Sequence, residues 1–228
     1  MTTSNQQLLD RWANLLRAAA EPALGLDDPS APFRDDLGHR RRVDNPFLAW
    51  RGRERIDPRL SAPDPRREPD VALWACLGSS PERPGDPAPV LDAHEPALGE
   101  DQGETFGGLF PQSEHTAIEV WTEIELSSLH ALWWLARRRD DAALRELVRA
   151  GAAWHVERLQ PDNATNHPWA IHVFVLHELA HPDSGAILYA ETLLSNCMVS
   201  MGRPDLFSAH VLMDAAGAAE EARREGSS

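Results

Sequence analysis

Five successive segments in the second half of the chain carry apolar residues at helical spacing, and this pattern constrains the fold more than any other feature. The segments cover about residues 114–138, 141–159, 168–180, 184–201 and 206–222. The breaks between them contain residues that end or begin helices, such as Gly202-Arg203-Pro204 followed by the capping residue Asp205. The pattern predicts a mainly α fold of antiparallel helical hairpins over residues 113–222, with a disordered tail at 223–228.

The first half of the chain has a less regular pattern. Residues 1–20 predict one amphipathic helix, and residues 21–112 predict an irregular region rich in proline, glycine and arginine. Inside this region the apolar run 71–77 suits either a buried strand or a turn of helix, and residues 78–112 suggest a linker or a lid. Segment 34–67 holds more arginines than acidic residues. We expect these arginines to pair with acidic residues of the same chain, with a basic binding patch as the alternative.

Charge and composition exclude several functions. All 22 basic residues are arginine, which excludes Schiff-base chemistry and the lysine-dependent phosphate-binding loop. The net charge of −14 disfavours nucleic acid and anionic membranes as partners, and no apolar run approaches the length of a membrane span. No signal peptide is visible, and Cys76 and Cys197 form no CxxC pair. We therefore expect a soluble cytoplasmic protein.

Three histidines recur about 40 residues apart in similar apolar surroundings, which is typical of a helical-hairpin repeat. They lie in Leu129-His130-Ala131-Leu132, Ile171-His172-Val173-Phe174 and Ala209-His210-Val211-Leu212. One interpretation places these histidines in an interior groove near Trp133 and Trp169, where they would contact a ligand. The favoured alternative places each of them in the core, with one ring nitrogen bonded to a neighbouring helix.

The sequence His177-Glu178-Leu179-Ala180-His181 has the spacing of a zinc site on a helix. The two imidazoles would bind the metal, and the glutamate would act as the base on a metal-bound water. Pro182 follows directly and should end the helix at the second histidine. A third ligand must come from another element, and Glu191 is the best candidate, with Asp183 and His167 as alternatives.

Four glutamates lie in or just before the first of the five helices, at positions Glu114, Glu119, Glu123 and Glu125. Two of them could form the paired carboxylates of a hydrolase. Glu119 and Glu123 are one helical turn apart, which is also the pattern of a solvated helix face. The solvated face is the favoured interpretation.

Residues 113–222 resemble the helical hairpins of α/α-toroid proteins, a group that contains six-hairpin glycosidases and terpenoid cyclases. They resemble short helical-repeat scaffolds equally well, and the histidine-centred pattern carries both likenesses. Because a complete toroid needs more hairpins than this chain holds, the resemblance implies a partial toroid or one completed by a homo-oligomer. The segment 177–181 resembles the metal-binding helix of zincin metallopeptidases.

These observations favour a helical scaffold, or a module that binds a protein partner or a small molecule, without a cofactor. The first alternative is a zinc-dependent hydrolase that uses His177, His181 and Glu191 as ligands and Glu178 as base. The second is a carbohydrate-active protein of the α/α-barrel type.

Overall fold

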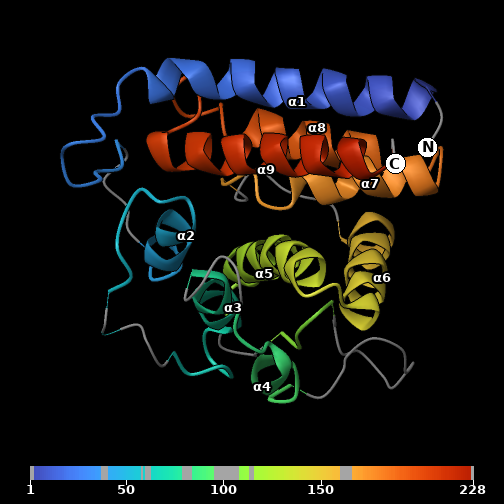
Figure 1. Ribbon diagram of the computed structural model, residues 1–228, viewed down its shortest axis with the longest axis horizontal. Coiled ribbons are helices and arrows are strands. Elements are labelled where there is room, and N and C mark those ends of the chain that lie inside the picture. Colours follow the sequence, from blue (N-terminus) through green and yellow to red (C-terminus); the bar gives the residue numbers. More distant parts are fainter. Residues whose placement is uncertain are drawn as a thin grey trace. The chain divides into compact units, whose positions relative to one another are not determined.

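The computed structural model describes residues 3–36, 41–57, 59, 63–78, 84–94, 108–112, 116–159 and 166–226. These residues form helices and no extended strand, which confirms the predicted mainly α class (Figure 1). The helices are α1 (Thr3–Leu24), α2 (Asp44–Trp50), α3 (Pro69–Gly78), α4 (Ala88–Leu91), α5 (Ile118–Arg138), α6 (Ala142–Arg158), α7 (Ile171–Ala180), α8 (Ala186–Asn196) and α9 (Leu206–Glu225). The consecutive pairs α5–α6 and α7–α8 pack against each other as hairpins.

The chain divides into two compact units. The discontinuous unit comprises Met1–His39 and Gln160–Ser228, and the central unit comprises Arg40–Leu159. The helical pattern predicts one core at 113–222, whereas the structure assigns α5 and α6 to the same unit as α2, α3 and α4. The apolar run 71–77 belongs to helix α3, so the region expected to be irregular supplies part of the buried interior.

Helix α1 packs along α9 in the discontinuous unit (Figure 1). The apolar stripe of α1, which includes Leu9, Trp12 and Leu16, is buried, and α9 presents buried alanines such as Ala215 and Ala219. Small residues allow the two helix axes to approach closely, and burial of the larger side chains stabilises the pair. The amphipathic pattern at the start of the chain is therefore satisfied by a helix about 200 residues later.

Three ion pairs and one contact between a histidine and a carboxylate connect the N-terminal segment to the region of α9. The pairs are Asp10 with Arg223 (2.9 Å), Arg17 with Glu220, Asp27 with His210 (3.3 Å) and Asp36 with Arg203 (2.6 Å). Residue numbers rise along one segment while they fall along the other, so the two segments run antiparallel. Partly exposed pairs of this kind contribute little stability each, and they fix the register of the two segments more than they strengthen the packing.

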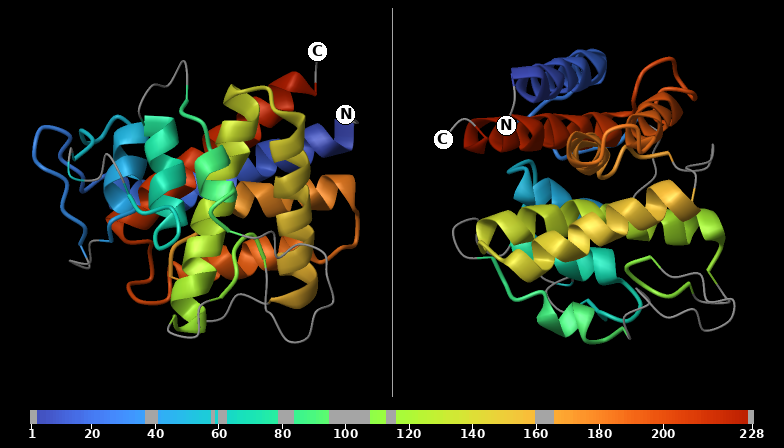
Figure 2. Two further views of the ribbon diagram at one scale, coloured as in Figure 1. Left: turned by 90° about the horizontal axis from the view of Figure 1, so that it is seen from below. Right: turned by 90° about the vertical axis from the view of Figure 1, so that its right-hand side faces the viewer.

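Helix α5 packs against both α3 and α6 in the central unit (Figure 2). The indole Nε1 of Trp74 on α3 donates a hydrogen bond to Ser127 Oγ on α5 at 3.1 Å. The ring of Phe47 on α2 lies edge-on to Trp74, with the centroids 5.0 Å apart. Since α5 is contacted from two sides, polar residues on both of its faces are removed from water.

Candidate functional site

Helix α7 ends at Ala180. In the segment 177–181, His177 therefore lies on the last turn of the helix and His181 lies just beyond its end. His181 has φ −134° and ψ 76°, which lies outside the helical region, as Pro182 predicts. The His177 and His181 rings nevertheless remain neighbours, with their centroids 4.8 Å apart. The structure therefore keeps the two imidazoles close together without the continuous helix of a zincin site.

The carboxylate of Glu178 stabilises the turn that follows α7. Its Oε1 accepts a hydrogen bond from the Asp183 amide at 2.7 Å, and its Oε2 accepts one from Ser184 Oγ at 3.0 Å. Asp183 and Gly185 have positive φ values of 66° and 88°, so this turn needs such support. Both oxygens of the proposed catalytic base are thus engaged by the chain itself.

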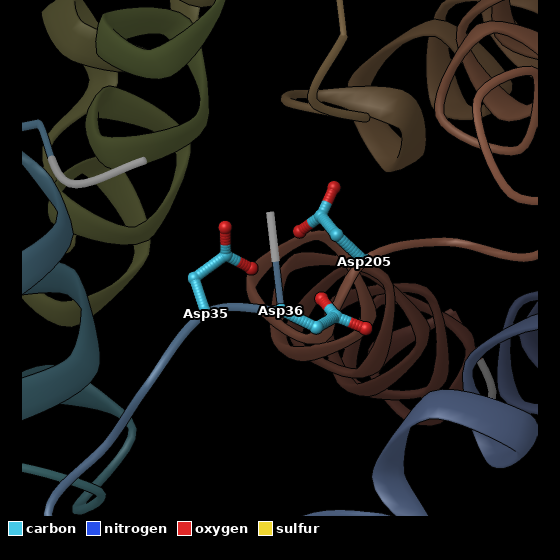
Figure 3. Close-up of side chains that lie close together, drawn as sticks. All are labelled: Asp35, Asp36 and Asp205. Carbon is cyan, nitrogen blue, oxygen red and sulfur yellow. The ribbon is translucent and has the colours of Figure 1, made fainter. Parts of the chain in front are cut away.

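Within the described residues, three potential metal ligands lie within 4.8 Å of one another at Asp35, Asp36 and Asp205 (Figure 3). The described residues His177, His181 and Glu191 do not form such a group. The structure therefore does not bring the three predicted zinc ligands together.

The aspartates of Figure 3 cap the first turn of α9. Asp205 accepts hydrogen bonds from the Ser208 amide (2.7 Å) and hydroxyl (2.8 Å), and Asp36 accepts one from the Leu206 amide (2.8 Å). Burial, the largest influence, raises the pKa of Asp36, but the Leu206 amide and the Arg203 guanidinium outweigh it and lower the pKa below the usual value. The predicted cap at Asp205 is confirmed, and these contacts account for the cluster as helix capping.

Two of the three recurrent histidines occupy core positions, and His210 is partly exposed. His130 and His172 are fully buried, and the His130 ring lies edge-on to Trp74 with the centroids 5.4 Å apart. His210 Nε2 lies 3.3 Å from Asp27 Oδ2. His130 belongs to the central unit, whereas His172 and His210 belong to the discontinuous unit.

The two tryptophans proposed to line a cleft with these histidines are buried as well. Trp169 is fully buried and packs edge-on to Phe207, and Trp133 is 7% exposed and lies under the Arg137 guanidinium. Their contacts are those of core anchors.

The solvated-face interpretation of the glutamates is wrong for Glu123 and Glu125, because both side chains are buried. Glu119 is partly exposed, and Glu114 lies outside the described residues. Two positions apart on α5, Glu123 and Glu125 point to different sides of the helix, which is packed on both. Their partners lie outside α5, which is why the spacing of the glutamates along this helix does not reveal them.

Glu125 binds the backbone of residues 108–110. Its carboxylate accepts hydrogen bonds from the Leu109 amide (2.7 Å) and the Phe110 amide (2.6 Å), and His155 Nε2 lies 3.4 Å from Oε2. A Cβ at Gly108 would lie only 2.0 Å from Glu125 Oε2, so only glycine allows this approach. The arrangement satisfies a fully buried carboxylate with two backbone donors.

Three further buried carboxylates, Asp44, Asp70 and Glu123, contact Arg41, and we call these three carboxylates the acid cluster. Arg41 Nη1 donates to Glu123 Oε2 at 2.9 Å, and its backbone amide donates to Asp44 Oδ2 at 2.7 Å. Arg41 Nη2 lies 3.7 Å from Asp70 Oδ2, beyond hydrogen-bond distance. The expectation that arginines of segment 34–67 pair with acidic residues of the same chain is confirmed here and for Arg42, which binds Glu68.

The surroundings of Asp70 disfavour its charged form. Burial raises its pKa from 3.8 to about 6 and the nearby Glu123 adds to the rise, whereas Arg41 and the Val71 amide oppose it. The Val71 amide donates to Oδ1 at 2.9 Å, and Oδ2 accepts no hydrogen bond although it is buried. A buried carboxylate oxygen without a donor is costly, and such groups occur preferentially at functional sites.

No described helix is both long enough and apolar enough to cross a lipid bilayer. Comparison with known proteins gives no match to a family model, to a curated protein or to a solved structure.

Proposed function

We propose that the chain is a helical ligand-binding module whose acid cluster binds a positively charged group. The observation that carries this proposal is Asp70: its side chain is buried, and its Oδ2 lacks a hydrogen-bond donor. A ligand cation that donates to this oxygen would remove the cost of the orphaned acceptor on binding. The net charge of −14 supports the same class of ligand, because it attracts cations to the surface over long range.

Isothermal titration of the full chain with agmatine, spermidine and calcium chloride tests the proposal. We expect saturable binding of at least one of these cations, weakened by Asp70→Asn, which keeps the shape of the side chain and removes its charge. Asp64→Asn is the matched control, because it makes the same change at an exposed carboxylate of the same unit. Absence of saturable binding, or equal weakening by both variants, refutes the proposal.

A zinc-dependent hydrolase is the second candidate function, and the proximity of the His177 and His181 rings favours it. Two imidazoles supply part of a zinc site, and Glu191 or a substrate would have to complete it. Metal analysis of protein purified without an affinity tag tests this candidate. Stoichiometric zinc that is lost on His177→Ala and kept on His94→Ala would support it, whereas metal-free protein with unchanged stability under chelation contradicts it.

A further inference from the structure

We infer that the acid cluster recognises a guanidinium group, and that Arg41 is an internal occupant which the ligand displaces. The inference rests on the proposed function and names its ligand class. It covers the guanidinium of a small molecule and that of an arginine side chain in a peptide, since both present the same planar group.

The shape of the cluster matches a guanidinium better than a metal ion or an ammonium. The two terminal nitrogens of Arg41 face different carboxylates, with Nη1 toward Glu123 and Nη2 toward Asp70. A guanidinium holds several N–H donors in one plane and can donate to both carboxylates at once, whereas an ammonium presents a compact charge. Among the described residues, Asp44, Asp70 and Glu123 do not form a group within 4.8 Å, as a metal site would require.

Exposure indicates where a ligand would enter. The Arg41 side chain is 31% exposed, whereas those of Asp70 and Glu123 are 3% and 9% exposed. The Arg41 side chain is therefore more exposed than the two carboxylates that it contacts, and we expect its withdrawal to open a path to them. Because the Arg41 amide is bound to Asp44, the side chain can move while its backbone stays in place.

Arg41 does not form a hydrogen bond with Asp70, and a ligand that forms one would gain binding energy from it. Nη2 is 3.7 Å from Asp70 Oδ2, so the charges attract but no hydrogen bond forms. A guanidinium that is not tethered at this position can place donors within hydrogen-bond distance of both carboxylates. Arg41 competes with such a ligand at the high effective concentration of a tethered group, and thereby lowers its apparent affinity.

The test compares guanidinium compounds with matched amines by titration of the full chain. Agmatine is paired with 1,5-diaminopentane, and the peptide acetyl-Gly-Arg-Gly-amide with acetyl-Gly-Lys-Gly-amide. We expect each guanidinium probe to bind at least about tenfold more tightly than its amine counterpart. If only agmatine binds more tightly than its amine counterpart, the ligand is a small molecule. If the arginine peptide also binds more tightly than the lysine peptide, the ligand is a peptide. Equal binding of amines and guanidinium compounds overturns the inference but leaves the proposed function standing, and lack of binding by every cation overturns both.

Variants of Arg41 test its role as the occupant. Arg41→Ala should raise the affinity for agmatine several-fold because the competitor is gone. Should the alanine variant fail to fold, Arg41→Lys retains the charge that the buried carboxylates need and loses the planar donor array, so it should raise the affinity in the same direction. Affinity that is unchanged or reduced in the folded variant overturns the role of Arg41.

Discussion

The raised pKa of Asp70 makes a quantitative prediction for Asp70→Asn. A carboxyl group with a pKa of 3.8 when unfolded and about 6 when folded stabilises the fold while it is protonated, and this contribution is lost as the pH rises through about 6. At about 1.4 kcal/mol per pKa unit, the full loss is about 3 kcal/mol, of which about 2 kcal/mol falls between pH 4 and pH 8. Asparagine does not titrate. Relative to the natural chain, the variant should therefore gain about 2 kcal/mol in free energy of unfolding over this interval.

Urea unfolding at pH 4, 5, 6, 7 and 8 measures this difference, with tryptophan fluorescence as the signal. Trp74 is fully buried on the same helix as Asp70, so it contributes to this signal from the neighbourhood of the change. Carboxylates far from Asp70 titrate in the same range, but they cancel in the difference between the two chains. Asp64→Asn, at an exposed position, should give a difference that hardly changes with pH. Parallel stability curves for the natural chain and Asp70→Asn would falsify the assignment of a raised pKa to this group.

Four further changes test the fold. Gly108→Ala should lower the free energy of unfolding by about 2 kcal/mol or more in urea titrations, because the new methyl group would push Glu125 away from its backbone donors. Gly217→Ala has open space around its Cβ inside α9 and should instead raise this free energy by about 0.5–1 kcal/mol; the opposite order of the two variants would contradict the packing described. Asp205→Ala should cost about 1 kcal/mol in the same assay through loss of the α9 cap, and an unchanged midpoint would contradict that role. His172→Ala should lower stability by about 2 kcal/mol in thermal unfolding, whereas a solvent-exposed ligand residue would tolerate the change.

Helices were predictable where local signals agree. The five segments after residue 113 combine apolar periodicity with helix-ending residues, and each corresponds to a helix between α5 and α9. Pro182 correctly predicted the end of α7. The run 71–77 could not be assigned, because a short segment made up entirely of apolar residues shows neither helical nor strand periodicity.

The partners of buried charges were not predictable. Arg41 and Glu123 are 82 positions apart, and Asp36 and the Leu206 amide are 170 apart, so no local pattern connects them. Periodicity shows which residues share a helix face, but it does not identify what that face contacts. For this reason a glutamate between two packed helices, such as Glu125, was mistaken for a solvated one.

The pairing of α1 with α9 also sets an order of events during synthesis. Arg17 and its partner Glu220 are 203 residues apart, which corresponds to roughly 10–40 s of translation at ~5–20 residues per second. Throughout that interval the apolar stripe of α1, with Leu9, Trp12 and Leu16, exists without the helix that buries it. The central unit draws its contacts from a continuous stretch of chain and can form within the same interval. The nascent chain therefore exposes the apolar stripe of α1 until α9 has been made, and a chaperone that shields α1 would act before α9 has emerged from the ribosome.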